Sequence, residues 1–223
     1  MSDSILVAGA TGGVGQQVTH QLIIAHRAVR ALVRDAQQAS RILDYQAEHV
    51  EGDVTRPASL AAALRDVRYV ICTIGSRAVH GGNPEQVDYT GVRNLVDAAK
   101  AAGVAHFVLV SSIGATQPDH PVNRFGQVLT WKLRGEDAVR NSGLSYTVVR
   151  PGGLIDEPGG RKGIVFAQGD CITGRVTRAD VATVCIQSLA QPAARNVTFE
   201  VINNDDAPPS DWPRVFATLK PDR

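Results

Sequence analysis

An apolar run near the amino terminus ends in a turn with three evenly spaced glycines. Residues 5–8 are apolar, the next residues read Gly9-x-x-Gly12-x-x-Gly15, and residues 16–24 have the apolar spacing of a helix. This order predicts a strand, a tight turn and a helix. Backbone amides at such a helix start lack intrahelical partners and face an incoming anion, which the helix dipole also favours.

The turn has the composition that a nucleotide pyrophosphate needs. Glycine lacks the Cβ that would keep a phosphate away from the main chain. We therefore expect the turn to bind a dinucleotide through the residues Gly9, Thr11, Gly12, Gly13, Val14 and Gly15. The spacing differs from the commoner G-x-G-x-x-G, and an ordinary strand-to-helix turn is the alternative interpretation.

Length, charge and cysteine content limit the class of protein. The 223 residues suit one domain, and 23 basic residues balance 22 acidic ones, so we expect neither nucleic acid nor a membrane as partner. The three cysteines are widely spaced and lack metal-ligand spacing, which favours reduced thiols and no metal site. Because the first predicted strand begins at residue 5, we expect no signal peptide and a cytoplasmic location.

Strands and helices alternate along the chain. This alternation predicts a single-domain α/β fold, a doubly wound parallel sheet of the Rossmann type. The expected strands are residues 5–8, 29–33, 49–51, 69–73, 106–111, 145–149 and 198–202. The expected helices include residues 84–103, 125–141 and 177–190. The predicted domain covers residues 1–204 with a mobile substrate-side loop at 152–173, followed by a tail at 205–223 with a short helix.

The end of the second strand indicates which nicotinamide cofactor fits. Arg34 lies about 20 residues beyond the last glycine, where Asp or Glu would bind the ribose 2′-hydroxyl of NAD and Arg a 2′-phosphate. We therefore expect NADP(H) to be preferred over NAD(H), with Arg34 as the anchor. The neighbouring Asp35 could pair with Arg34 or repel the phosphate.

Two further strand ends are expected to contact the nucleotide. Asp53 and Val54 follow the third strand, where Asp53 either accepts a hydrogen bond from the adenine amine or caps the next helix. Thr73, Ile74 and Gly75 close the fourth strand, and the small residues there let the backbone pass close to the ribose.

With these elements in place, the chain resembles the short-chain dehydrogenase/reductase superfamily. More narrowly, it is similar to the atypical NAD(P)-binding branch that includes NmrA-like and flavin-reductase-like proteins. The motifs that carry the resemblance appear in the expected order at residues 9–15, 32–35, 52–54, 91–96, 108–112, 146–152 and 177–182.

The resemblance implies which residues do chemistry. Standard members use a Tyr acid, a Lys four residues later that contacts the ribose, and a Ser at the end of the fifth strand. Ser111 and Ser112 match the serine position and Lys132 the lysine position, but Val128 occupies the tyrosine position. Lys132 could instead form a surface pair with Glu136.

The loop after the sixth strand is also implied to contact the cofactor. By resemblance, the backbone of Pro151, Gly152 and Gly153 would meet the nicotinamide carboxamide. His80 and His120 lie in loops at the carboxyl ends of strands, where ligands bind in such sheets, although a solvated loop histidine is the simpler interpretation.

Three functions compete on this basis. The first is an NADPH-dependent reductase of a small acceptor, such as a flavin, quinone or carbonyl compound, that works without the tyrosine. The second is a non-catalytic NADP(H)-sensing or scaffold protein of NmrA-like type, with a protein partner. A sugar epimerase or dehydratase fits less well, because those relatives keep the tyrosine and carry a larger substrate domain. Both a monomer and a homodimer are compatible with the sequence.

Overall fold

The computed structural model describes residues 3–44, 46–76 and 78–222, so the first two residues of the predicted domain and the last residue of the predicted tail lie outside it. The strands are β1 (Ser4–Ala8), β2 (Val29–Val33), β3 (Glu48–Glu51), β4 (Val67–Cys72), β5 (His106–Val110), β6 (Tyr146–Pro151), β7 (Gly153–Ile155), β8 (Gly163–Ala167), β9 (Arg175–Thr177) and β10 (Val197–Asn204). The helices are α1 (Gly13–Ile24), α2 (Ala36–Ala39), α3 (Leu60–Ala63), α4 (Val92–Ala101), α5 (Val128–Arg140), α6 (Arg178–Ala190) and α7 (Trp212–Ala217). Short helical turns are η1 (Pro57–Ser59), η2 (Ala78–His80), the π-helical turn η3 (Glu85–Gly91), η4 (Pro121–Arg124) and η5 (Pro192–Ala194).

A mostly parallel sheet forms the centre of the molecule. Its strand order is β3-β2-β1-β4-β5-β6-β10-β8, and β8 alone among the described strands of this sheet runs antiparallel to its neighbour, β10. The order reverses beside β1, so the carboxyl ends of β1 and β4 flank the crevice where such sheets bind ligands. The predicted Rossmann fold is confirmed.

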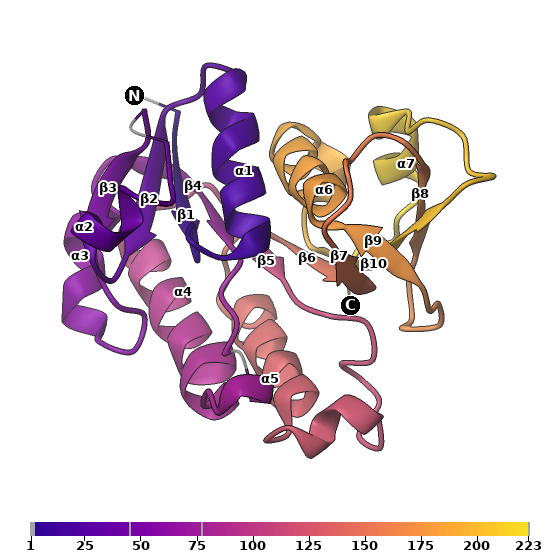
Figure 1. The fold of residues 1–223 in the computed structure, drawn as a ribbon, viewed down its shortest axis with the longest axis horizontal. Helices are drawn as coiled ribbons and strands as arrows, with labels where there is room; N and C mark the ends of the chain where they lie inside the picture. The colour runs from indigo at the N-terminus through magenta and orange to yellow at the C-terminus, as the bar shows by residue number, and fades with distance from the viewer. Residues whose placement is uncertain (1–2, 45, 77, 223) are drawn as a thin grey trace.

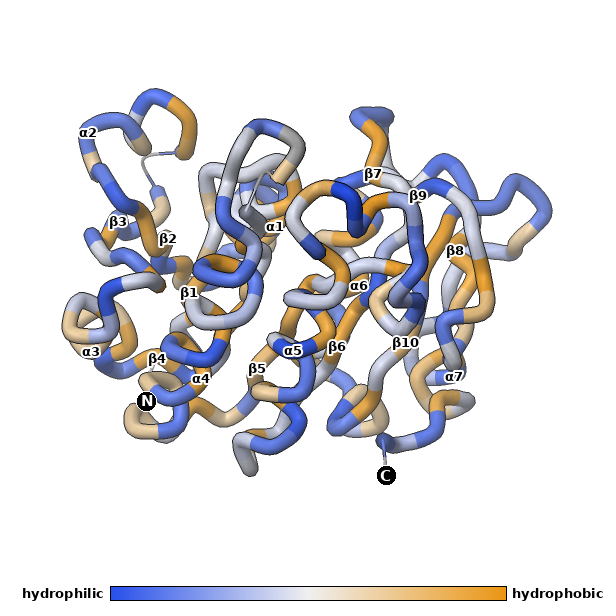
Figure 2. Tube along the Cα trace, turned by 90° about the horizontal axis from the view of Figure 1, so that it is seen from below, coloured by the Kyte–Doolittle hydropathy of each residue, from blue (hydrophilic) through white to orange (hydrophobic). Residues whose placement is uncertain are grey.

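Helices cover both faces of the sheet. Helices α1 and α6 lie on one face and α4 and α5 on the other (Figure 1). Successive residues of β1 point to opposite faces, so Ile5 and Val7 join the core under α1 and α6, whereas Leu6 and Ala8 join the core under α4 and α5. Figure 2 shows the hydrophobic segments gathered along the interior strands.

The region after β6 differs from the prediction. The sequence predicted a mobile loop at residues 152–173, and this is wrong for the residues of β7 and β8. Strand β7 pairs with β9, and β8 pairs with β10 through five residue pairs. Glycines bound both short strands and hide their pattern in the sequence, whereas pairing with distant strands satisfies their backbone groups. Within the described residues, no helix has the length and apolar character needed to span a bilayer.

Candidate functional site

The glycine turn is built by close backbone packing. Gly9 has a φ of +82°, and a Cβ there would lie 2.8 Å from Thr73 Oγ1. A Cβ at Gly15 would lie 2.1 Å from the Gly9 carbonyl oxygen, so α1 packs directly on the turn. The Gly12 amide donates to Gly9 O at 2.9 Å. Two of the three spaced glycines are therefore required by the architecture itself.

The start of α1 remains available to an anion. Gly12 is the N-cap residue, and no side chain caps the helix there. A Cβ at Gly12 would meet one heavy atom, Gly9 O at 3.2 Å, so the glycine leaves open space in front of the helix amides. Thr11 is half-buried, whereas Val14 packs into the core. An uncapped helix start with an open approach fits a pyrophosphate.

The two residues after β2, Arg34 and Asp35, have different roles. The Asp35 carboxylate accepts a hydrogen bond from the Gln38 amide at 2.9 Å and so caps α2. Arg34 is exposed at the end of β2. The cap holds the Asp35 carboxylate at the start of α2, which leaves the Arg34 guanidinium as the cation at this strand end.

At the predicted adenine position, the Asp53 carboxylate is engaged in local hydrogen bonds. Its Oδ1 accepts hydrogen bonds from the Thr55 amide at 2.9 Å and the Thr55 hydroxyl at 2.8 Å. Burial would raise the pKa of Asp53, but these bonds and the charges of Arg56 and Arg34 hold it below the usual value. Asp53 therefore holds a local turn with Thr55 and does not cap the next helix, because the N-cap residue of η1 is Arg56. Val54 is half-buried and lies against Gly91, where a Cβ would meet its methyl group at 2.8 Å.

The end of β4 forms the floor of the crevice. Thr73 Oγ1 donates to the carbonyl oxygen of Ala8 at 3.0 Å, which joins β4 to the glycine turn. Ile74 lines a cavity of about 10 Å³, room for about one water molecule, beneath this strand end. Gly75 is exposed, and a Cβ there would still lie 4.0 Å from Asp88 Oδ1. The chain therefore leaves space at Gly75 for a ligand.

Lys132 projects toward the same small cavity, which also includes Asp88, Val110 and Ser111 in its lining. Its ammonium lies 2.8 Å from Asp88 Oδ1, and the Asp88 side chain is 1% exposed. Asp88 Oδ2 accepts a hydrogen bond from the Ser76 amide at 3.2 Å. The alternative surface pair with Glu136 is wrong, because Glu136 is fully buried and has other partners.

Ser111 begins a buried polar cluster. Its hydroxyl donates to Glu136 Oε1 at 2.5 Å, and the same oxygen accepts from Arg150 Nε at 3.0 Å. Glu136 Oε2 accepts from Arg150 at 2.7 Å and from Arg140 at 2.6 Å. Burial would lower the pKa of Arg150, but the bonds and charge of Glu136 raise it above the usual value. The Ser111 proton is therefore directed toward Glu136.

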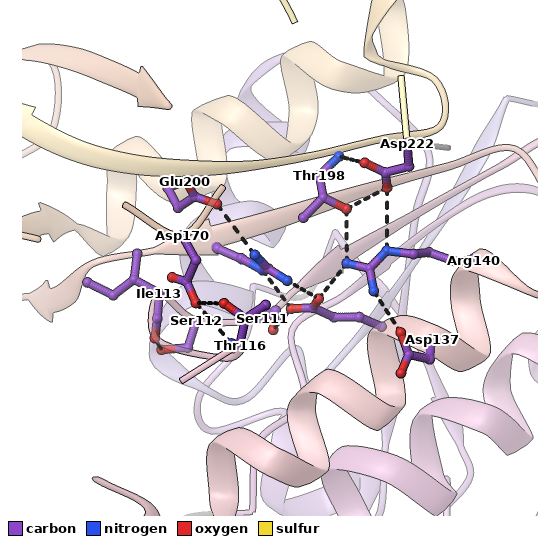
Figure 3. Close-up of polar contacts among 12 residues, drawn as sticks. Ser111, Ser112, Ile113, Thr116, Asp137, Arg140, Asp170, Thr198, Glu200 and Asp222 are labelled. Atoms are coloured by element: carbon purple, nitrogen blue, oxygen red, sulfur yellow. Dashed lines mark hydrogen bonds and ion pairs between the residues drawn. The ribbon is translucent and has the colours of Figure 1, made fainter. Parts of the chain in front are cut away.

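The cluster continues toward the carboxyl terminus (Figure 3). Arg150 Nη1 lies 3.5 Å from Glu200 Oε1 on β10, and Arg140 reaches Thr198 at 3.2 Å. Thr198 Oγ1 donates to Asp222 Oδ2 at 2.6 Å. Arg140 and Arg150 also line an open cleft of about 530 Å³ on this side of the molecule. The cluster joins α5, β6, β10 and the tail.

Ser112 is more exposed than Ser111. It is half-buried, and its hydroxyl donates to the Ile113 carbonyl at 3.0 Å. Asp170 holds this loop by accepting hydrogen bonds from the Gly114 amide at 2.6 Å and the Thr116 amide at 2.9 Å. Sequence reasoning missed Asp88, Glu136 and Asp170 as residues of this region. Asp88 lies inside a predicted helix, Asp170 lies in the predicted loop, and Glu136 was considered as a surface partner of Lys132, so the pattern carried no signal of their roles.

No tyrosine replaces the missing acid within the described site. Tyr146 donates its hydroxyl to Asp222 at 2.9 Å, and burial together with Asp222 raises its pKa. Val128 is the first residue of α5 and is half-buried. His120 accepts a hydrogen bond from the Val122 amide at 3.2 Å, caps η4 and is half-buried, so it has a local structural role and is not simply solvated. His80 is exposed.

The main chain after β6 is held by the sheet. The Gly152 amide donates to Val201 O at 2.9 Å and the Gly153 amide to Gly174 O at 2.9 Å. A Cβ at Gly152 would lie 2.5 Å from Gly174 O. Pro151 ends β6 and accepts a hydrogen bond from the Ile113 amide at 3.1 Å. The Gly152 and Gly153 amides are therefore engaged within the protein.

Comparison with known proteins gives relatives over most of the chain. An uncharacterized chloroplastic protein of Arabidopsis thaliana is 36% identical over 97% of this chain and 82% of its own length. Sanguinarine reductase of Eschscholzia californica is 40% identical over 127 residues, which are 54% of this chain and 46% of the relative. Among solved structures, the anaerobilin reductase ChuY of Escherichia coli O157:H7 has a TM-score of 0.77 at 30% identity, covering 92% of this chain and 99% of that one.

The comparisons contradict the expected cytoplasmic location. The Arabidopsis relative that matches almost the whole chain is chloroplastic. The expected cytoplasmic location was inferred from the reduced thiols and from the position of the first strand. Neither feature distinguishes between the compartments in which such a fold is found.

The family assignment follows from the same region as the site. Residues 9–192 match the model of a family described as NAD(P)H-binding. This range contains the glycine turn, Arg34, the serines after β5 and Lys132. The resemblance to atypical short-chain dehydrogenases/reductases is confirmed. The chain belongs to this NAD(P)H-binding family of Rossmann-fold proteins.

Proposed function

We propose that the protein is an NADPH-dependent reductase of a small conjugated acceptor, a flavin, quinone or carbonyl compound, that takes its proton from water. One observation carries this proposal: the polar groups that line the described cavity are already engaged. Ser111 donates to Glu136, Lys132 lies against Asp88, and Val128 stands where a tyrosine acid is usual. An acceptor that needs hydride delivery alone suits such a site.

The proposed preference for NADPH rests on Arg34 and Asp35. An NAD-selective site uses an acidic residue at this strand end to bind the ribose 2′-hydroxyl. Here the acidic residue caps α2, and the exposed guanidinium suits a 2′-phosphate dianion.

The bound cofactor would supply the hydride. The tasks of the chain are then binding, orientation and exclusion of water. The glycine turn holds the pyrophosphate, and Lys132, fixed by Asp88, contacts the nicotinamide ribose. Ser112, half-buried at the end of β5, would turn its hydroxyl from the Ile113 carbonyl to the acceptor. Ser111 positions α5 through Glu136.

The relatives support a small organic acceptor. Two of the similar proteins are reductases by name, sanguinarine reductase and anaerobilin reductase. Their identities with this chain are 40% over 127 residues and 30% over most of the chain. We take from them the reaction class, and the acceptor of this protein is to be found by a screen.

A fluorescence titration tests the cofactor part of the proposal. Wild type and Arg34→Ala are titrated with NADPH and NADH. We expect wild type to bind NADPH more tightly, and Arg34→Ala to lose about tenfold or more in NADPH affinity with NADH unchanged, since a charge-assisted contact is removed. Equal affinities of wild type for both cofactors would contradict the NADPH preference. Failure to bind either would contradict the proposed function itself.

A sensing or scaffold role is the second candidate. The engaged Ser111 and the absence of a tyrosine at Val128 favour it as well, because neither feature requires turnover. Oxidation of bound NADPH by any of the three acceptor classes distinguishes the reductase from the sensor.

A further inference from the structure

Arg178, the first residue of α6, lies directly over the glycine turn. A Cβ built on Gly13 would lie 2.6 Å from Arg178 Cδ and 2.7 Å from Arg178 Nε. Gly13 is the first residue of α1 and is exposed on its other sides. The absence of a side chain at Gly13 thus makes room for a guanidinium beside the helix start that faces the pyrophosphate.

Positive charge is concentrated at this point. The side chain of Arg178, the first residue of α6, reaches Gly13, the first residue of α1, and each helix dipole places partial positive charge at that end. A cation at a helix start is unfavourable unless an anion compensates it. Asp180, the acidic residue in the first turn of α6, is bound instead to the Gly160 amide at 2.8 Å, Thr177 Oγ1 at 2.8 Å and Asn203 at 2.9 Å.

The ion partner of Arg178 among the described residues is a surface carboxylate. Arg178 Nη1 lies 2.9 Å from Asp156 Oδ1, and the Asp156 side chain is 85% exposed. An exposed ion pair of this kind contributes about 0–1 kcal/mol, so its exchange for another anion costs little. The Arg178 side chain is 27% exposed, so solvent reaches part of it.

The position of Arg178 is fixed by the packing of α6 on α1. Gln21 Nε2 donates to the Ala179 carbonyl at 2.9 Å, and Thr183 Oγ1 donates to Gln21 Oε1 at 3.0 Å. These bonds hold the first turn of α6 against α1. The guanidinium therefore needs a change of side-chain rotamer alone to move from Asp156 to a ligand on the glycine turn.

We propose that Arg178 binds the cofactor pyrophosphate from the side of α6, exchanging the Asp156 carboxylate for phosphate oxygens. This inference rests on the proposed binding of NADP(H) at the glycine turn. It divides the recognition of the cofactor between two arginines: Arg34 reads the 2′-phosphate, and Arg178 holds the phosphates that NADP(H) and NAD(H) share. Arg178 thus contributes affinity without selectivity.

Calorimetric titration of Arg178→Gln tests this division. The ligands are NADPH, NADH and adenosine 2′-monophosphate, which has the 2′-phosphate and lacks the pyrophosphate. We expect Arg178→Gln to weaken NADPH and NADH alike by about 10- to 100-fold and to leave adenosine 2′-monophosphate unchanged. The matched variant Arg34→Gln should weaken NADPH and adenosine 2′-monophosphate and spare NADH.

Asp156→Asn is the control for a merely structural ion pair. It breaks the same pair and leaves the guanidinium free, so we expect NADPH to bind as tightly as to wild type or more tightly. Equal loss of affinity in Asp156→Asn and Arg178→Gln would overturn the inference, as would wild-type affinity in Arg178→Gln. Thermal melting of the ligand-free variants checks that each is folded; if Arg178→Gln is not, Arg178→Lys takes its place, with an intermediate loss expected. Binding of NADPH to wild type is established first, because its absence would refute the proposed function rather than the role of Arg178.

Discussion

Ser111 and Lys132 occupy the positions that the resemblance predicted, yet their partners give them different tasks. Ser111 donates to Glu136, which lies one helical turn beyond Lys132 on α5, and Lys132 pairs with Asp88 on η3. Asp88 is 44 positions before Lys132 in the chain. Pairing at this separation depends on how η3 and α5 pack, so the sequence pattern predicts the residue and not its partner.

Replacing Glu136 tests the buried cluster. In Glu136→Ala, Arg150 stays buried with its main partner removed, and we expect a loss of about 3–5 kcal/mol in the free energy of unfolding. Asp137→Ala is the matched control, because its carboxylate pairs with Arg140 at an exposed position and should cost about 0–1 kcal/mol. Urea denaturation measures both. A similar, small loss in the two variants would show that the cluster adds little stability.

His106 predicts a pH dependence of stability. Burial, assisted by the charge of Arg195, lowers its pKa from 6.5 to about 4, and its ring contacts the hydroxyls of Ser145 and Thr147. The unfolded chain therefore binds more protons than the folded one between these pKa values. Titration of His106 leaves the free energy of unfolding unchanged above the unfolded pKa and lowers it as the pH falls toward 4. At a pH of about 5 the loss in the free energy of unfolding is about 2 kcal/mol.

The measurement is the free energy of unfolding of wild type and His106→Gln at matched pH values. The variant lacks the titrating ring, so its stability should fall less steeply on acidification. Parallel pH profiles for the two proteins would exclude His106 as the source of the effect.

At the scale of elements, the strands and long helices were more predictable than the short pieces between them. The seven expected strands correspond to β1 to β6 and β10, because most of them are continuous apolar runs, which identify strands buried on both faces. Strands β7 and β9 have three residues each, too few for a periodic pattern. The π-helical turn η3 was predicted as the start of an ordinary helix, since a change of hydrogen-bond register leaves no mark in the residue pattern.

The contact between α5 and η3 can be tested at Gly135. A Cβ at this position would lie 2.3 Å from the Asp88 carbonyl oxygen, so Gly135→Ala must push the two elements apart. We expect a loss of about 1–3 kcal/mol in stability, and weaker NADPH binding because Lys132 and Asp88 separate. Gly153→Ala is the control for stability, since its Cβ would have 3.6 Å of clearance. Unchanged NADPH affinity in Gly135→Ala would argue against a role of the Lys132–Asp88 pair in binding.

At the scale of the whole molecule, the candidate site lies at the carboxyl edge of the mostly parallel sheet. The glycine turn follows β1, Arg34 follows β2, and Ser112 lies just after β5, so they meet the end of β4 at one edge because these strands run in the same direction. The fold and this edge were predictable from the sequence, because the order of elements determines both. The division of the chain at residue 205 and the oligomeric state stay predictions. Location was not predictable, since it does not depend on the packing of the sheet.

Single-turnover oxidation of bound NADPH tests the central claim most directly. The protein with one equivalent of NADPH is mixed with excess flavin, quinone or carbonyl acceptor, and the nicotinamide absorbance is followed. We predict oxidation matched by one equivalent of reduced acceptor, at a rate that varies little with pH around neutrality because the proton comes from water. Tight NADPH binding without oxidation by any acceptor class would contradict the account and leave the protein a cofactor sensor.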